Sequence, residues 1–209
     1  MVPIAAPPLR NVTDIVRLLE AHADLHALLC HVESLGLPDC WIGAGFIRNA
    51  VWDVLHGHAI DVSRLNDIDV IFFDPADTGK GREADLEHQL RRQAPQVVWS
   101  VKNQARMHLR NGDAPYRDTF DAIAHWAETA TAVAARTVRG QVDVIAPYGV
   151  EDLLNLVVRP TPAFRSKMEI YRDRVAGKSW PARWLRLRLL LTWEEAERSP
   201  YSSLVRMDT

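Results

Sequence analysis

Two acidic side chains separated by one residue lie at the start of an apolar run near the middle of the chain. Asp67 and Asp69 alternate with Ile68, Val70 and Phe72. Alternate side chains of an extended strand point to opposite faces, so both carboxylates lie on one face, about 7 Å apart along the backbone. Their repulsion favours a bound cation such as Mg²⁺, which prefers oxygen ligands and often accompanies phosphates. The pattern therefore predicts either a metal site or a pair of exposed loop acids before an ordinary strand.

A glycine turn upstream of the two acids is the second stretch with chemical potential. Gly43 and Gly45 separate a short apolar run at 40–42 from a helical pattern that carries Arg48 and Asn49. One interpretation is a dinucleotide-binding unit, in which the helix N-terminus holds a pyrophosphate. The other is a cradle of backbone amides that binds phosphates beside the metal-binding acids. The second is favoured because Arg48 stands where a third glycine would be needed and the next strand begins with acids.

The composition is that of a soluble globular protein. Of 209 residues, 47% are hydrophobic and 25% are charged, with a formal net charge of −2, which fits one core or a core with a small appendage. Cys30 and Cys40 have no zinc-site spacing and cannot build a disulfide framework, so we expect a reduced, cytoplasmic setting. No apolar run approaches the roughly 18 residues of a membrane-spanning helix, so we expect no membrane partner.

The remaining pattern predicts short strands alternating with helices in a single domain. The core spans about residues 11–160, and a basic helical extension spans about 161–195. Between Arg159 and Arg188, nine Lys and Arg residues oppose two acids, a net charge of +7. We expect tails at 1–10 and in the last ten residues, strands at 40–42, 68–72 and 96–101, a hairpin at 132–145 that turns at Arg139 and Gly140, and helices at about 11–35, 47–55, 82–93, 119–126, 149–157 and 162–175.

Read together, the glycine turn and the acid pair resemble a known superfamily. Gly43 through Asn49, followed by Asp67-Ile68-Asp69 twenty-two residues after Gly45, resemble the nucleotidyltransferases that include DNA polymerase β. The first motif is similar to the head motif of tRNA CCA-adding enzymes and bacterial poly(A) polymerases. Over about residues 38–190 the chain resembles a bacterial family of nucleotidyltransferase-like proteins, through the segments WIGAGFIRN, NDIDV, VKNQARMH and IAPYGVEDLLNLVVRP.

The resemblance implies an α/β (α+β) fold with a polymerase β-like core, a short mixed sheet flanked by helices, and a small helical C-terminal extension. It also implies Mg²⁺, as two ions, held by Asp67 and Asp69, with a nucleoside triphosphate laid across the glycine turn. Arg48 is expected either to contact phosphate or to pair with the acidic strand. The expected nucleotide contacts are Gly43, Gly45, Arg48, Asn49, Lys102 and Arg106, and further candidates for the triphosphate or the acceptor are Arg165, Lys167 and Arg172.

One departure from the superfamily pattern concerns the third carboxylate, which helps to bind the catalytic metal and to activate the attacking hydroxyl. Ser100 stands between Trp99 and Val101, where we would expect related sequences to carry an acid. Asp143 offers an acid in the same pattern but later in the chain, and we take it as the provisional third catalytic acid beside Asp67 and Asp69. Smaller departures are Asn49 and Ala44, which replace an Asp and a second adjacent glycine of the head motif.

These expectations lead to a functional hypothesis with two alternatives. The leading hypothesis is a cytoplasmic, Mg²⁺-dependent nucleotidyltransferase that moves a nucleoside monophosphate from an NTP to an unknown hydroxyl on RNA, protein or a small molecule. The first alternative is a non-catalytic nucleotide- or RNA-binding module that retains the fold, as Ser100 and the basic C-terminal stretch would allow. The second is a scaffold role.

Overall fold

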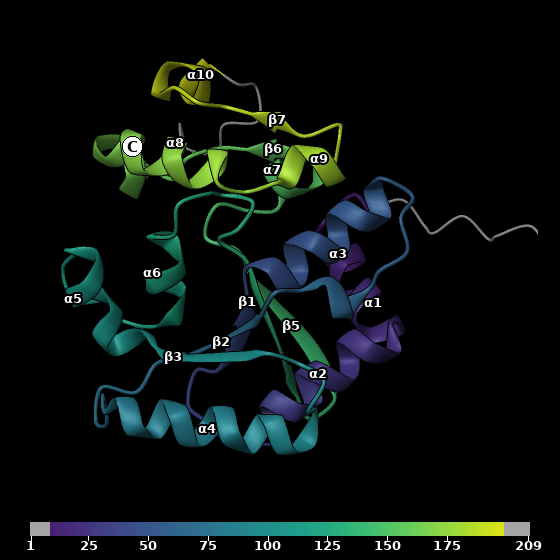
Figure 1. Ribbon diagram of the computed structural model, residues 1–209, viewed down its shortest axis with the longest axis vertical. Coiled ribbons are helices and arrows are strands. Elements are labelled where there is room, and N and C mark those ends of the chain that lie inside the picture. The colour runs from purple at the N-terminus through teal and green to yellow at the C-terminus, as the bar shows by residue number, and fades with distance from the viewer. Residues whose placement is uncertain (1–8, 199–209) are drawn as a thin grey trace, which may run out of the picture.

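A five-stranded mixed sheet forms the centre of the protein (Figure 1). The computed structural model describes residues 9–198, so the predicted tails lie almost entirely outside the described residues. The strand order is β3-β2-β1-β4-β5, in which only β2 and β3 are parallel. This arrangement confirms the predicted short mixed sheet. The strands are β1 (Trp41–Gly43), β2 (Ile68–Phe72), β3 (Trp99–Asn103), β4 (Ala134–Val138) and β5 (Gln141–Ile145).

The two faces of the sheet have different chemistry because β2 alternates as its sequence predicts. Ile68, Val70 and Phe72 are buried in a hydrophobic core with apolar side chains of the first four helices. Asp69 points to the opposite face, and its partner in the parallel register of β3 is Ser100. The helices that contribute to the apolar core are α1 (Val12–Ala21), α2 (Ala23–Glu33), α3 (Gly45–Leu55) and α4 (Lys80–Gln93).

Several expected elements differ from those observed. The helix expected at 149–157 is limited to Glu151–Leu154 and is followed by positive φ at Leu156 (59°), with Val157 in a short strand. The helix expected at 162–175 begins as a separate 3-10 helix, Pro162–Lys167. The single helix expected at the N-terminus is two helices, because His22 has an extended conformation (φ −89°, ψ 108°) that ends α1 and precedes α2. The strand expected at 96–101 begins three residues later, since a turn in which the Val97 amide donates to the Ala94 carbonyl occupies its start. The predicted hairpin turn is present, with positive φ at Arg139 (53°) and Gly140 (80°), as a two-residue type I′ turn requires.

The C-terminal extension packs across one end of the sheet, at the top of Figure 1. Trp180 and Trp184 meet the ring of Trp52 in α3 edge to face, with centroids 5.6 and 5.1 Å apart. The Tyr171 hydroxyl lies 3.0 Å from the carbonyl oxygen of Val158. The extension thus shares the core of the sheet domain. Its elements are β6 (Val157–Val158), η3 (Pro162–Lys167), α8 (Met168–Ala176), α9 (Trp180–Arg183), β7 (Arg188–Leu189) and α10 (Trp193–Arg198).

Short helical segments complete the chain between these elements. They are η1 (Val62–Arg64), η2 (Gln104–Arg106), α5 (Met107–Asn111), α6 (Thr119–Ala124) and α7 (Glu151–Leu154). Helix α6 covers part of the face that carries Asp69, because Ile123 packs there against Trp41 and Ile71. Within the described residues, no helix has the length and apolar character needed to cross a membrane.

Candidate functional site

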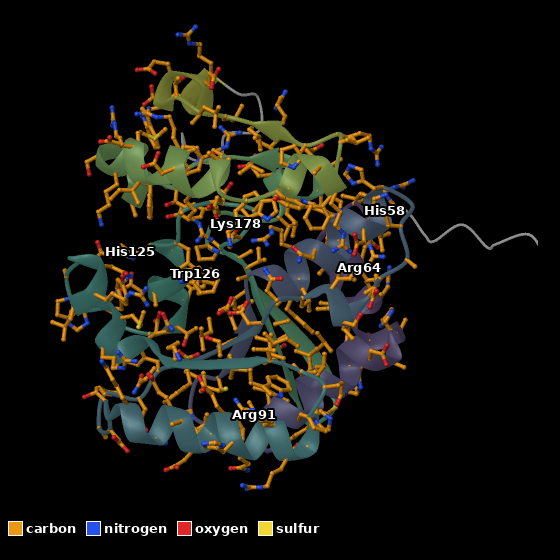
Figure 2. The ribbon with its side chains drawn as sticks, viewed as in Figure 1. His58, Arg64, Arg91, His125, Trp126 and Lys178 are labelled. Atoms are coloured by element: carbon orange, nitrogen blue, oxygen red, sulfur yellow. The ribbon has the colours of Figure 1, made fainter. Side chains whose placement is uncertain are left out.

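A pocket of about 510 Å³ lies between the acid-bearing face of the sheet and the C-terminal extension. Asp69, Ser100 and Lys102 form part of its floor, and Ala44 of the glycine turn lies at its border. Figure 2 shows His125 and Trp126 in the region between the sheet and the extension. The extension contributes the opposite wall through Phe164, Lys167, Ile170 and Arg174. The pocket thus combines the acidic strand, the glycine turn and the basic extension.

The carboxylate of Asp69 is in an environment that disfavours its negative charge. Burial, and then the charge of the neighbouring Asp67, raise the pKa of Asp69 to about 6. The positive charges of Arg48, Arg174 and Lys178 act in the opposite direction but do not compensate fully. The structure therefore brings Asp67 and Asp69 together, as the sequence predicts. A divalent cation beside them would relieve the repulsion that raises this pKa.

The two candidates for the third acid occupy very different places. Ser100 is directly beside Asp69 in the parallel register of β2 and β3. Asp143 lies on β5, three strands away from β2, which at about 4.8 Å per strand is roughly 14 Å. Its carboxylate pairs instead with Arg136 of β4, with Oδ2 3.3 Å from Nε. Asp143 is too far away to share a metal ion with Asp69, which corrects the expectation that it is the third catalytic acid.

The acid pair fits a single Mg²⁺ ion that also binds phosphates. Among residues 9–198, no group of three or more His, Cys, Asp or Glu side chains is placed to hold a metal ion. Mg²⁺ is commonly held by one or two carboxylates together with water and substrate phosphates. Asp67 and Asp69 meet that requirement.

The glycine turn joins β1 to α3 in a conformation that few side chains tolerate. Ala44 has φ 53° and ψ −120°, in the region that favours glycine, and the helix begins at Gly45. A methyl group on Gly43 would lie 2.6 Å from Cη2 of Trp126. The packing of Trp126 therefore requires glycine at position 43. A methyl group on Gly45 would meet its nearest neighbour, Nη2 of Arg48, only at an ordinary van der Waals distance of 3.5 Å. The unpaired amides of the first turn of α3 thus start at the border of the pocket.

Arg48 is a buried structural cation. Its Nη1 donates to Oγ1 of Thr131 at 2.9 Å, its Nη2 donates to Oδ1 of Asn49 at 3.0 Å, and its guanidinium lies 4.5 Å from the ring centroid of Trp180. Burial lowers the pKa of Arg48 to about 10. Arg48 and Asn49 are thus paired with each other and do not line the described pocket. Arg48 influences the acidic strand through its charge on Asp69, without an ion pair within the described residues.

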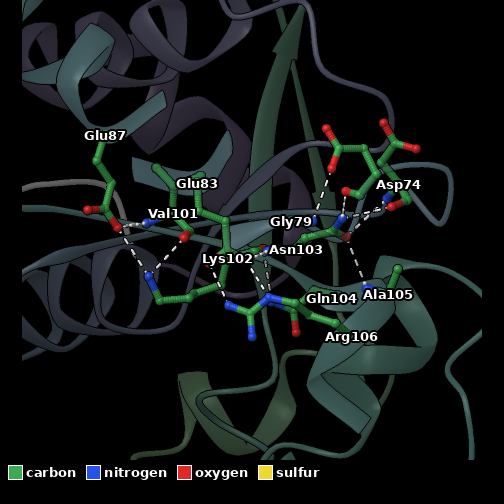
Figure 3. A network of polar contacts seen from close by, with 11 residues as sticks. Asp74, Gly79, Glu83, Glu87, Val101, Lys102, Asn103, Gln104, Ala105 and Arg106 are labelled. Atoms are coloured by element: carbon green, nitrogen blue, oxygen red, sulfur yellow. Dashed lines mark hydrogen bonds and ion pairs between the residues drawn. The ribbon is translucent and has the colours of Figure 1, made fainter. Parts of the chain in front are cut away.

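Arg106 is also held by a protein carboxylate. Its Nε donates to Oε1 of Glu83 at 2.9 Å, and the same oxygen accepts the backbone amide of Asn103 at 2.8 Å (Figure 3). Glu83 is only 4% exposed. This arrangement fixes the turn that follows β3 to helix α4. Because Arg106 is engaged in this pair and lies outside the described pocket lining, the structure does not place it as a nucleotide contact.

Lys102 at the edge of the sheet both pairs with a carboxylate and lines the pocket. Its Nζ lies 3.1 Å from Oε1 of Glu87, which also accepts the backbone amide of Val101 at 2.9 Å (Figure 3). Glu87 thereby covers an amide that β3 would otherwise expose at the sheet edge. Unlike Arg106, Lys102 lines the pocket. It is therefore the one of these two cations that lies within reach of a bound molecule.

The extension places further cations at the site, and sequence reasoning selected only one of them. Lys167 lines the pocket and pairs with Asp113, with Nζ 2.9 Å from Oδ1. Arg165 and Arg172 are exposed and do not belong to the described lining. Arg174 lines the pocket, and both Arg174 and Lys178 act on Asp69. Because α8 ends at Ala176, Lys178 lies in the turn that follows it, and helical spacing in the sequence could not have grouped it with Arg174.

Comparison with known proteins gives a consistent result. A family model described as Nucleotidyltransferase matches residues 30–189. A solved structure whose description states that it reveals a CCA-adding enzyme head domain is 36% identical, with a TM-score of 0.78, and the match covers 87% of this chain and 97% of that chain. This similarity confirms the predicted fold class. No curated protein matches the sequence.

More distant structures share the fold alone. A complex of a CCA-adding enzyme with CTP is 14% identical, with a TM-score of 0.53, and is matched over 87% of this chain and 43% of that chain. The Thermotoga maritima CCA-adding enzyme complexed with tRNA is 15% identical, with a TM-score of 0.50, over 90% of this chain and 45% of that chain. The present chain thus spans less than half the length of these two enzymes.

Proposed function

Because the chain belongs to the nucleotidyltransferase family, we propose that it transfers a nucleoside monophosphate from an NTP to a hydroxyl group. The observation that carries the proposal is the position of Asp69, in a 510 Å³ pocket that also contains the glycine turn and cations of the extension. Side chains of the core and of the extension line the same pocket, so we propose that the core and the extension form a single functional domain. The expected cytoplasmic location remains a proposal.

The reaction assigns a separate task to each part of the pocket. The hydroxyl oxygen attacks the α-phosphorus in line, its proton passes to water, and the bond from the α-phosphorus to the bridging oxygen breaks so that pyrophosphate leaves. Asp67 and Asp69 would hold Mg²⁺, which when bound would supply positive charge to the phosphate oxygens. The free amides at the start of α3, which follow Ala44, bind phosphate oxygens with help from the helix dipole. Lys102 lies on the same floor as Asp69 and adds a positive charge.

We propose one resident Mg²⁺ ion instead of the two that the resemblance implies. Ser100 offers a neutral hydroxyl where a third carboxylate would activate the attacking hydroxyl, so no described acid other than Asp67 and Asp69 lies at the reacting centre. We therefore expect the chain to bind the nucleotide but to activate the acceptor hydroxyl only weakly. Slow turnover follows from this arrangement.

The acceptor is a hydroxyl of RNA, protein or a small molecule, and RNA is favoured by charge. The net charge of +7 between Arg159 and Arg188 matches a polyanion. Enzymes with the same fold have been solved in complex with tRNA. Transfer of labelled nucleotide to total RNA, to protein or to small molecules identifies the acceptor class directly.

A second candidate function is nucleotide binding without transfer. The specific observation in its favour is Ser100, which occupies the position beside Asp69 where the third acid is expected. Under this alternative the protein binds Mg²⁺ and NTP at the same site and transfers no label to any acceptor. The two functions differ only in turnover.

Calorimetric titration of Mg²⁺ and ATP tests the proposed site. Asp69→Asn is expected to abolish the Mg²⁺-dependent part of ATP binding because it removes a metal ligand. Asp143→Asn is the matched control, since it removes an acid of the same sheet face roughly 14 Å away. Equal ATP binding by wild type and Asp69→Asn refutes the assignment. Transfer of labelled nucleotide that is lost in Asp67→Asn supports catalysis over binding alone.

A further inference from the structure

A fully buried carboxylate fixes one cation of the extension at the wall of the pocket. Glu128 has no exposed surface, and its Oε1 and Oε2 accept hydrogen bonds from Nε and Nη2 of Arg174 at 2.6 and 3.4 Å. A guanidinium has five N–H donors, and Nη1 of Arg174 has no hydrogen-bond partner among residues 9–198. Glu128 thus holds one edge of Arg174, while the other edge remains available to a ligand in the pocket.

The neighbourhood of Glu128 retains positive charge. Glu128 also favours the charged form of Arg48, whereas Arg174 opposes it, although the described ion pair of Glu128 is with Arg174. Lys178 adds a third cation in the turn that follows α8. It is exposed, and Figure 2 shows it where the extension faces the sheet. Arg174 lines the pocket together with Asp69, whereas Lys178 lies outside the described lining.

We propose that Arg174 binds the β- or γ-phosphate of the nucleoside triphosphate, and that Glu128 is the positioning residue that orients Arg174 for this contact. The inference rests on the proposed function, because it assigns residues to the same nucleotide site. The sheet supplies the anionic side that holds a cation, and the extension supplies the cationic side that holds phosphate oxygens. A triphosphate with a bound cation matches both sides.

Other cations near the pocket are less suited to this role. Lys102 is paired with Glu87 at 3.1 Å and Lys167 with Asp113 at 2.9 Å. Each of these carboxylates is partly exposed. Glu128 differs because it is completely buried. The bidentate pair with Glu128 makes the orientation of Arg174 specific, as phosphate recognition by arginine requires.

The experiment measures the affinities of ATP, ADP, AMP and inorganic tripolyphosphate by calorimetry, each with and without Mg²⁺. Arg174→Ala is expected to weaken ATP and tripolyphosphate binding about 10- to 100-fold, as the loss of a charge-assisted hydrogen bond predicts, and to change AMP binding by less than about threefold. Arg172→Ala is the matched control. It removes an exposed arginine of the same helix that lies outside the described pocket lining, and unchanged affinity is expected.

The variants also separate orientation from folding. Glu128→Gln is expected to weaken ATP but not AMP binding, and to have little further effect when combined with Arg174→Ala. A purely structural role for Glu128 would instead lower both affinities equally. Arg174→Lys keeps the test decisive if the Glu128 variant or Arg174→Ala does not fold, because it keeps the positive charge beside Glu128 but removes the guanidinium edge; it too is expected to weaken ATP but not AMP binding.

The outcomes distinguish this inference from the proposed function. If wild type binds Mg²⁺ and ATP in a manner that depends on Asp69, while Arg174→Ala binds ATP as tightly as wild type, only the phosphate assignment fails. If Arg174→Ala loses ATP and AMP affinity to the same degree, Arg174 does not recognise the β- or γ-phosphate, and the assignment fails again. If wild type binds neither ATP nor tripolyphosphate, the proposed function itself is refuted.

Discussion

Replacing Ser100 with Asp is expected to supply the carboxylate that the site lacks. Ser100 is in direct register with Asp69 in the adjacent parallel strand, on the face that forms the floor of the pocket. Neighbouring strands lie about 4.8 Å apart, so the new carboxylate would lie about 5 Å from that of Asp69. Three acids at this distance form the ligand set that two metal ions require.

The size of the effect follows from the repulsion between like charges. Two charges about 5 Å apart repel by about 3 kcal/mol at an effective dielectric constant of 20. The pKa of Asp69 is already raised to about 6, so part of the added repulsion is relieved by protonation. Without Mg²⁺ at pH 7 we expect Ser100→Asp to lower the free energy of unfolding by about 1–3 kcal/mol. This corresponds to a fall in Tm of about 2–10 °C for a chain of this size.

Addition of Mg²⁺ is expected to reverse this loss and to increase nucleotide transfer. Thermal unfolding with and without Mg²⁺, and transfer of label from an NTP, are the two assays. Ser100→Asn is the control, because it has the shape of Asp without the charge. The reasoning is refuted if Ser100→Asp and Ser100→Asn lose the same stability without Mg²⁺, or if Mg²⁺ restores neither. Restored stability without increased transfer would show that another group limits the reaction.

Three further predictions concern individual side chains. Asp69→Asn is expected to raise the free energy of unfolding by up to about 3 kcal/mol at pH 8 but little at pH 4, measured by urea unfolding. The reason is that the pKa of Asp69 rises from 3.8 to about 6 on folding, so the folded state binds more protons in this window and wild-type stability falls as pH rises through it. Ala44→Gly is expected to stabilise the protein by about 1 kcal/mol, since it removes the strain of a φ of 53°, and an unchanged or lower Tm would contradict this. Arg106→Ala is expected to destabilise the protein by about 3 kcal/mol because it leaves Glu83 buried without its ion pair, while ATP affinity stays unchanged in calorimetry; a selective loss of ATP binding would return Arg106 to the nucleotide site.

Local patterns in the sequence were sufficient for much of the fold. The alternation of acids and apolar residues around Asp69 predicted both the strand and its two faces, because the period of a strand is fixed by backbone geometry. Gly140 between two strand-like runs predicted the hairpin turn, since glycine tolerates the positive φ that a tight two-residue turn requires, whereas nothing in the sequence marked the positive φ of Arg139. The break at His22 was missed because apolar spacing continues across it, and the extended conformation of one residue leaves no mark in that spacing.

The third acid could not be located in this way. Val142-Asp143-Val144 has the same alternation as Ile68-Asp69-Val70, and the strand registers do place Asp143 on the face of Asp69. Alternation fixes the face of a strand but not its position in the sheet, which depends on long-range pairing. The partners of Arg48 and Arg106 were hidden for the same reason, because a sequence shows that a residue is charged but not which distant carboxylate or aromatic ring it meets.

The charges around Asp69 explain why a single position decides between binding and catalysis. Burial and the repulsion of Asp67 disfavour the charged form of Asp69. The positive charges of Arg48, Arg174 and Lys178 act in the opposite direction. Under the proposed function, these cations favour a site for a metal and a triphosphate with or without a third carboxylate. Ser100 would then leave the acceptor without an activating carboxylate while the nucleotide site stays in place. We therefore expect Ser100→Asp to change the transfer rate more than the affinity for ATP, and Arg174→Ala to change the affinity first.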